Sequence, residues 1–424
     1  MFKKFRYPNK IRLLMIPSRD TKAVTVLFLF GVGSRYESKD VNGVSHFIEH
    51  LMFKGTKKRQ TTLDISKEVD RVGAEFNAMT SKDYTGYFVK VDQSEQALAI
   101  DVLSDILLNS TFLPKEINRE RGVIVEEINM YHDNPIMHIE SLLEEAIYQG
   151  SSLAREVCGP RKVIKSISRE KILDFKNKYY AADNLVIAIA GKIDKKTKSI
   201  LEKKFINKIK PKENFSKRIF TALGSKQDAP RIKLHFRKTR QAQIALGFPA
   251  YGYNDPRAYG LHLLSIVLGG NMSSRLFTAV REKSGLCYFI RCFPNFYEDC
   301  GDIIIQSGLD VSRIEEAMDI ISRELKRIKT AGVTAKELRN AKEFLRGKII
   351  LNLEDSSNSA EYYAKQELLQ NKILTPEEKM KKYQAVTRKQ LRNIAAEIFT
   401  IDKFNLATIG PFKSKKYFSQ KIKL

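Results

Sequence analysis

An internal repeat near the end of each half of the chain restricts the folds that are open to it. Segments 168–191 and 387–410 align without a gap at a constant offset of 219 residues. In both segments a helical pattern leads into an apolar strand that stops at a glycine, Gly191 or Gly410. Residues of similar type that recur at a constant offset are typical of a duplicated unit. The alternative is a chance similarity between two helix–strand junctions. We therefore expect two homologous halves.

The boundaries of the halves follow from a basic stretch in the middle of the chain. Lysines are dense over 195–217, and the pattern turns irregular from Pro211 onward. This predicts a first half over 1–210, a linker over 211–228 and a second half over 229–424. A strand near 242–247 would then correspond to a strong apolar strand near 24–32.

The remaining pattern mixes strands and helices without the regular alternation of a parallel-sheet fold. A strand pair is predicted over 74–91, with a polar turn at 81–83, and a further strand over 184–191. Helices are predicted over the following segments: 45–53, 94–109, 114–132, 136–149 and 168–180.

The charge of the chain is strongly basic, with 74 Lys and Arg against 49 Asp and Glu and a formal net charge of +25. Such a charge permits contact with nucleic acid or anionic lipid, but by itself it is a property of the surface and does not identify a function. The lysines are scattered over the whole chain, and the basic run at 195–217 lacks the interleaved aromatic residues of a stacking surface. A basic nucleic-acid-binding protein remains an alternative, but no specific nucleic-acid partner is predicted.

Four cysteines in 424 residues do not form a disulfide framework, and no CxxC pair indicates a metal site, so we interpret them as structural thiols. The basic N-terminus lacks the apolar run of a signal peptide, and no stretch approaches the ~20 apolar residues of a membrane span. We expect a soluble, cytoplasmic protein with no membrane span.

The residues that indicate chemistry most clearly are His46, Glu49 and His50, in the pattern H-x-x-E-H. On a helix these positions share one face, so two imidazoles can reach one Zn²⁺ and the carboxylate can act on its water. The flanking residues 43–45 and 51–53 are mostly apolar. A charged trio in apolar surroundings needs a partner. The alternative is a histidine pair with no metal.

A catalytic zinc requires a third protein ligand and keeps one position for water. Glu120 and Glu127 are seven residues apart on a predicted helix and so share a face, whereas Glu126 points elsewhere. One of the pair could bind the metal while the other orients the site. Spacing alone does not choose among the candidates, which are Glu75, Asp83, Glu126, Glu127, His132 and His138.

Two segments, 46–56 (HFIEHLMFKGT) and 120–130 (ERGVIVEEINM), closely resemble the pitrilysin-type zinc peptidases. The most similar subgroup contains the β subunit of mitochondrial processing peptidase and its bacterial relatives. The resemblance implies an α+β fold of two homologous halves, each an antiparallel-rich sheet covered by helices. It also implies one Zn²⁺ per chain, bound by His46, His50 and Glu127.

The same resemblance assigns roles to two further carboxylates. It makes Glu49 the general base that activates water, and it places Glu120 as the second acidic residue near the metal. The second half contains no H-x-x-E-H motif, so one active site per chain is expected, in the first half.

Segments 269–277 (GGNMSSRLF) and 280–288 (VREKSGLCY) resemble the signature of the family's C-terminal half. By this resemblance Arg281 and Tyr288 contact substrate, with the tyrosine near the scissile carbonyl. A guanidinium and a phenol suit donation to a developing oxyanion.

A third resemblance covers an edge strand that would pair with an extended peptide substrate beside the zinc. A plain hairpin is equally compatible with the local sequence. The predicted substrate-binding residues are Phe76, Asn77, Ala78, Met79 and Thr80.

Together these features predict a zinc-dependent endopeptidase that cuts unfolded peptides or short protein segments in a chamber between half-units. The resemblance implies a homodimer, or a heterodimer with an inactive homologous subunit. The alternative is a non-catalytic structural subunit of a peptidase-like complex, in which the metal motif is typically degraded; here the motif is intact.

Overall fold

The computed structural model describes residues 2–211, 220 and 227–421, which form two compact units. The first unit comprises Met1–Ile128, Arg155–Ile219 and Ile350–Ile373, and the second comprises Asn129–Ala154, Phe220–Ile349 and Leu374–Leu424. The predicted linker, 211–228, lies largely outside the described residues. The predicted boundaries of the halves stay a prediction.

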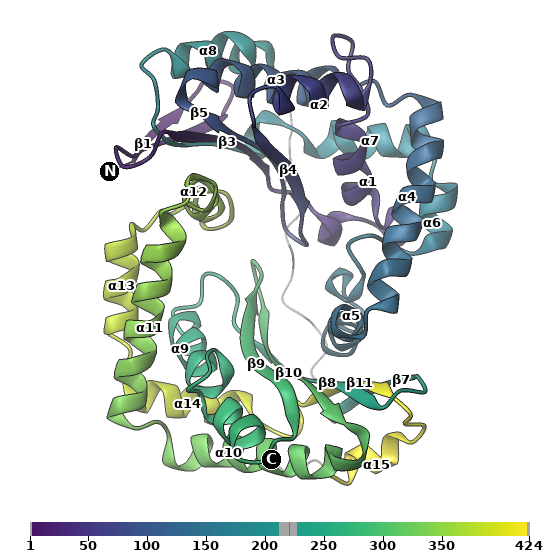
Figure 1. Ribbon diagram of the computed structural model, residues 1–424, viewed down its shortest axis with the longest axis vertical. Coiled ribbons are helices and arrows are strands. Elements are labelled where there is room, and N and C mark those ends of the chain that lie inside the picture. The colour runs from purple at the N-terminus through teal and green to yellow at the C-terminus, as the bar shows by residue number, and fades with distance from the viewer. Residues whose placement is uncertain (1, 212–219, 221–226, 422–424) are drawn as a thin grey trace. The chain divides into compact units, whose positions relative to one another are not determined.

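The first unit is built on a six-stranded sheet with the order β1-β2-β6-β3-β5-β4 (Figure 1). Its central strands are runs of β-branched, aromatic and aliphatic residues that are buried on both faces, as expected for a sheet covered by helices on each side. The strands are β1 (Lys3–Arg6), β2 (Arg12–Pro17), β3 (Ala23–Phe30), β4 (Glu75–Thr80), β5 (Thr85–Asp92) and β6 (Leu185–Gly191).

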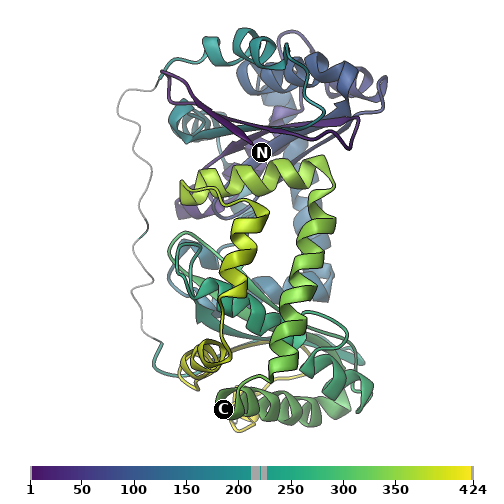
Figure 2. The same ribbon diagram turned by 90° about the vertical axis from the view of Figure 1, so that its left-hand side faces the viewer.

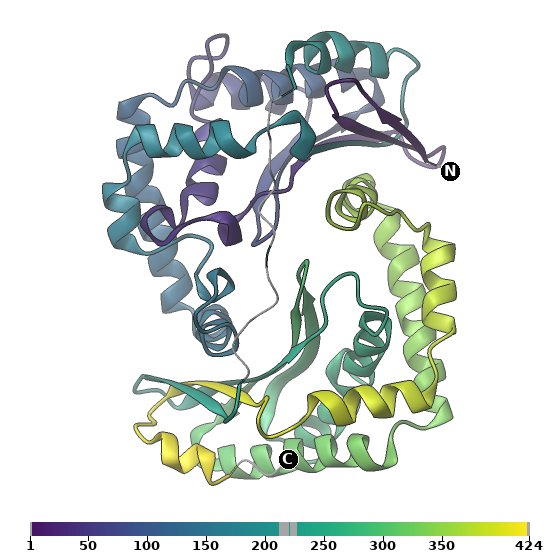
Figure 3. The same cartoon turned by 180° about the vertical axis from the view of Figure 1, so that it is seen from behind.

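Helices cover both faces of this sheet. Helices α3 (Gln96–Asn109) and α8 (Thr197–Lys204) pack together, with α3 on β3 and β5, while α12 (Ser356–Gln370) packs on β2, β3 and β6 from the other side (Figures 1 and 2). Helix α7 (Arg169–Tyr179) lies beside α1 (Val44–Met52), as the teal and purple helices in Figure 3 show.

The second unit is built on a five-stranded sheet with the order β7-β11-β8-β10-β9. Helix α5 (Pro135–Ile147) packs on β7, β8 and β11, and α9 (Ala258–Gly269) packs on β9 and β10. The strands are β7 (Arg231–Phe236), β8 (Gln241–Ala250), β9 (Cys287–Phe296), β10 (Gly301–Asp310) and β11 (Asn405–Gly410).

The two sheets repeat the same pairing pattern. The glycine-terminated strand β6 lies between antiparallel β3 and parallel β2, and its counterpart β11 lies between antiparallel β8 and parallel β7. The preceding helices α7 and α14 (Arg388–Ile398) correspond in the same way, each with a hydroxyl N-cap. The predicted α+β fold with two helix-covered, antiparallel-rich sheets is confirmed.

Each half of the chain contributes a helix to the unit built mainly from the other half. Helix α5 comes from the first half but belongs to the second unit, and α12 comes from the second half but belongs to the first. Helices α4 (Pro114–Asp133) and α11 (Ala335–Leu353) lead into these segments. The compact units are therefore made of interleaved pieces of sequence.

The remaining longer helices are α2 (Thr62–Asp70), α10 (Ile314–Ala331) and α13 (Pro376–Gln384). No helix among the described residues is both long and apolar enough to cross a membrane.

Candidate metal centre

Helix α1 presents His46, Glu49 and His50 from the first unit, as the motif predicts. The helix begins at Val44 and its N-cap residue is Gly43, whose φ of +97° favours glycine. Gly43 has no side chain that could accept hydrogen bonds from the first backbone N–H groups of the helix. Instead the carboxylate of Glu37, which is fully buried, accepts hydrogen bonds from the backbone N–H of Gly43 at 2.7 Å and of Ser45 at 2.8 Å. This buried carboxylate fixes the start of the helix.

Three donor atoms converge beside α1. The Nε2 atoms of His46 and His50 are 3.1 Å apart, and Oε2 of Glu127 lies 3.5 Å from the first and 3.3 Å from the second. Ligands about 2.1 Å from a tetrahedral zinc are about 3.4 Å from one another. The three side chains are therefore spaced like three corners of a zinc tetrahedron, with the fourth corner left over.

Glu120 supports this group from α4. Its Oε1 lies 2.8 Å from Nδ1 of His50, and its Oε2 lies 2.8 Å from Nζ of Lys54. Because Nδ1 is engaged in this way, Nε2 of His50 is the nitrogen left to bind a metal. Glu127 is two helical turns further along α4 and supplies the converging oxygen.

The charges of the site are coupled. Burial lowers the pKa of His50, but its hydrogen bonds with Glu120 and Glu127 outweigh burial and raise the pKa to about 9. Burial raises the pKa of Glu127, but the two histidines outweigh it and hold that pKa well below its ordinary value. A metal ion that binds Nε2 of His50 would have to displace the proton that this raised pKa favours.

Glu49, on the same helix face as His46 and His50, contacts the end of strand β4. The hydroxyl of Thr80, the last residue of β4, donates a hydrogen bond to Oε2 of Glu49. Strand β4 pairs with β5 alone among the described strands and forms the edge of the sheet. The predicted peptide-binding segment thus lies at a sheet edge whose last side chain contacts Glu49.

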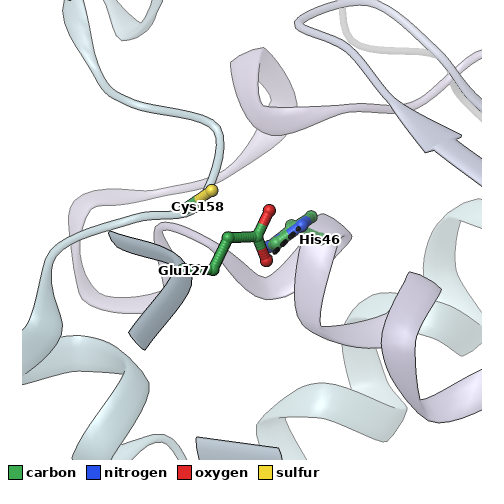
Figure 4. A group of neighbouring side chains, drawn as sticks. All are labelled: His46, Glu127 and Cys158. Carbon is green, nitrogen blue, oxygen red and sulfur yellow. Dashed lines mark ion pairs between the residues drawn. The ribbon is translucent and has the colours of Figure 1, made fainter. Parts of the chain in front are cut away.

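Cys158 lies near the converging donors. Its Sγ and one ligand atom each of His46 and Glu127 all lie within 4.8 Å of one another (Figure 4). Burial, with the nearby carboxylates of Glu127 and others, raises the pKa of this thiol. All four cysteines are free thiols.

Arg281 and Tyr288 lie together in the second unit. The guanidinium carbon of Arg281 is 5.5 Å from the centre of the Tyr288 ring and 4.6 Å from that of Phe277. Arg281 is in the π-helical turn η7 (Phe277–Glu282), and Tyr288, which is 82% exposed, is at the start of the edge strand β9. The metal-site residues belong to the first unit.

The other candidate ligands take part in different contacts. Glu75 pairs with Lys90, and Asp83 lies 3.6 Å from Arg35. His132 and His138 belong to the second unit, where their rings stack. Glu126 is exposed on α4 and is not among the converging groups.

Sequence reasoning did not single out Glu37, Lys54 or Cys158 as part of this site. Glu37 and Lys54 look like ordinary surface charges in the sequence. Cys158 is 112 residues from His46 in the chain and lies in no recognisable metal-binding spacing. Only the tertiary structure brings Glu37 and Cys158 to their places beside α1, whereas Lys54 follows α1 directly in the chain.

Two family models match most of the chain. The model described as insulinase (peptidase family M16) matches residues 12–161, and the model described as peptidase M16 inactive domain matches residues 166–345. The chain belongs to peptidase family M16. The first match contains the H-x-x-E-H motif and the second does not, and the predicted relationship to the pitrilysin-type peptidases is confirmed.

Curated relatives of this M16 chain carry the name of zinc proteases. An uncharacterized zinc protease of Bacillus subtilis, YmxG, is 34% identical and covers 97% of this chain and 98% of its own. An uncharacterized zinc protease of Streptomyces coelicolor is 32% identical over 96% of this chain and 89% of its own. This chain is therefore a member of a zinc protease family.

Solved structures support the fold. A protease from Helicobacter pylori matches with a TM-score of 0.90 at 23% identity, over 97% of this chain and 99% of its own. A peptidase M16 inactive domain from Pseudomonas fluorescens matches with a TM-score of 0.88 at 19% identity, over 97% and 99%.

Proposed function

We propose that this M16 protein is a zinc-dependent endopeptidase with one zinc per chain, held by His46, His50 and Glu127. The observation that carries the proposal is the 3.1–3.5 Å spacing of the three donor atoms, which fits the corners of a zinc tetrahedron. The fourth corner is available to water and substrate, as in a catalytic centre.

When bound, zinc supplies a Lewis acid that lowers the pKa of water and polarises a peptide carbonyl. Glu49 is the base that takes the water proton and delivers it to the leaving amine. Thr80 engages Oε2 of Glu49, so Oε1 is the oxygen available for the proton. Glu120 holds His50 in the tautomer that presents Nε2.

Arg281 and Tyr288 are proposed to donate hydrogen bonds to the substrate. A guanidinium packed against an exposed phenol offers donors that suit a carbonyl oxygen as negative charge develops on it. The support for this role is the family signature over residues 269–288 together with the exposure of Tyr288.

The proposed substrates are unfolded peptides or short protein segments. The free edge of β4 supports this class, because an extended peptide can add to an edge through backbone hydrogen bonds whatever its side chains are. We further propose that two chains, either identical or homologous, pair to enclose a chamber; sedimentation of the purified protein tests this pairing.

The first experiment measures zinc content and cleavage of a quenched, unstructured peptide by the wild type, Glu49→Gln and the exposed-site control Glu126→Gln. About one zinc per chain in all three, with chelator-sensitive cleavage lost only in Glu49→Gln, is the expected result. Absence of zinc from folded wild type would overturn the ligand assignment. Substantial cleavage by Glu49→Gln would overturn its role as base.

A further inference from the structure

Cys158 is the one residue in the metal-site group of Figure 4 that the proposed mechanism does not use. Its side chain is directed toward the carboxylate of Glu127, and the residue is only 9% exposed. A sulfur, a carboxylate oxygen and an imidazole nitrogen within 4.8 Å of one another form a donor set that zinc accepts readily.

The backbone holds this thiol in place. A Cβ atom on Gly43 would lie only 2.5 Å from the backbone carbonyl oxygen of Cys158. A Cβ atom on Gly159 would lie only 2.2 Å from the backbone carbonyl oxygen of Asn42, so both positions leave room for glycine alone. The Asn42 amide also donates to the carbonyl oxygen of Glu156 at 3.2 Å. The loop that carries Cys158 is therefore pressed against the start of α1, the helix that carries His46.

The thiol is close enough to share a metal with these ligands. On a tetrahedral zinc, a sulfur at about 2.3 Å and a nitrogen at about 2.1 Å are separated by about 3.6 Å. From separations of up to 4.8 Å, the sulfur would have to approach these atoms by up to roughly 1 Å, a displacement on the scale of a side-chain rotation of about 30° about the Cα–Cβ bond.

We propose that Cys158 is a reversible fourth ligand of the metal, whose thiolate takes the position otherwise open to water and holds the centre in a closed, inactive form. The inference rests on the proposed zinc site. In the closing step the thiol releases its proton to solvent, a sulfur–zinc bond forms, and the water at the fourth position leaves. Opening reverses each change.

The closed form competes with catalysis because a zinc with four protein ligands resembles a structural site. If closed and open forms are equally populated, removing the sulfur raises peptide hydrolysis about twofold, and a larger closed fraction gives a larger increase. The thiolate also makes the centre softer than a site of two imidazoles and a carboxylate.

The test loads metal-free wild type, Cys158→Ser, Cys158→Ala and the control Cys287→Ser with Co²⁺ alone and records their absorption spectra. A cobalt–thiolate bond gives an intense near-ultraviolet charge-transfer band, which a nitrogen and oxygen ligand set lacks. We expect this band in the wild type and in Cys287→Ser, and its loss in both Cys158 variants, with cobalt still bound. The zinc-loaded Cys158→Ser protein should cleave the test peptide at least about twofold faster than wild type.

The outcomes separate this inference from the proposed function. Cobalt bound to wild type without the charge-transfer band would overturn the role of Cys158 and leave the three-ligand site intact. The band with no increase in hydrolysis on removal of the sulfur would overturn the inactive closed form. Failure of folded wild type and folded Cys158→Ser to bind any cobalt would overturn the zinc centre, and the closed form with it.

Discussion

Glu120 Oε1 lies 2.8 Å from His50 Nδ1, on the side of the imidazole ring away from the converging donor atoms. Lys54 lies 2.8 Å from the other oxygen of the same carboxylate, whose side chain is 2% exposed. The orientation and tautomer of His50, one of the proposed metal ligands, thus depend on a buried carboxylate that is itself held by a lysine just after the end of α1.

Replacing Glu120 should weaken the metal site without removing a ligand. Glu120→Gln is expected to lower zinc affinity about 10- to 100-fold, because the amide supports His50 less well than the carboxylate does. Competition with a chromogenic chelator measures this affinity. Glu126→Gln, an exposed change on the same helix, is the control, and equal affinities for the two variants would contradict the supporting role.

Thr80 should affect turnover more than metal binding. Thr80→Val removes the hydroxyl that donates to Glu49. We expect kcat to fall about ten- to a hundredfold, which corresponds to the free energy that a hydrogen bond to a charged group contributes. Zinc content should stay at the wild-type level. Thr80→Ser keeps the donor and should restore most of the rate; a serine variant as slow as the valine variant would indicate loss of packing instead.

The edge of β4 makes a specific prediction about peptide binding. The backbone N–H of Ser81 donates to the carbonyl oxygen of Tyr84 on the β5 side. Because the N–H groups of successive residues in a strand point to alternate sides, the N–H of Ala78 faces the edge away from β5. There it donates to Oδ1 of Asn77 at 2.8 Å. Ala78→Pro removes this donor and should lower kcat/KM about tenfold with zinc retained. Ala78→Gly keeps the donor, and a loss of the same size there would argue against backbone pairing.

Glu37 should make stability depend on pH. Burial raises the pKa of Glu37 to about 7, even though several hydrogen bonds favour its charged form. The folded state therefore holds a proton that the unfolded state releases near pH 4.5, so this residue's contribution to stability falls as pH rises from about 4.5 to 7 and is level above that. The free energy of unfolding of wild type relative to Glu37→Gln should fall by on the order of 2–3 kcal/mol between pH 5 and 7.5.

Urea denaturation of the metal-free proteins at both pH values measures this difference. Lys54→Gln, which leaves the cap of α1 unchanged, is the control. A wild type and a Glu37→Gln variant whose stabilities change in parallel with pH would contradict a titrating buried cap.

The local structure and the convergence of the candidate ligands on α1 and α4 could be predicted from sequence because both depend on short-range spacing. Helical periodicity places His46, Glu49 and His50 on one face and Glu120 above Glu127, and the structure has these elements within a few residues of the predicted bounds. The repeat likewise predicts β6 and β11 as equivalent strands, which their matching partners confirm.

The environment of those residues could not be predicted, because it depends on contacts between distant segments. Nothing near Glu37 in the sequence indicates that its carboxylate is buried under the start of α1, and nothing near Cys158 indicates proximity to His46. The placement of α5 in the second unit and of α12 in the first, which we call the helix exchange, could not be predicted either. The sequence of an amphipathic helix indicates that one face is apolar, but it does not indicate which sheet that face packs against.

The helix exchange determines at which stage of synthesis the candidate metal site can form. One face of the sheet behind the candidate site is covered by α12, which ends at Gln370, so a nascent chain that has released His46, His50 and Glu127 still lacks one cover of its core. Domains generally fold as they leave the ribosome, from the N-terminus onward. Here the first unit is complete only when the chain has been made as far as Gln370, so a truncated product carries the candidate metal ligands without the complete sheet that positions them.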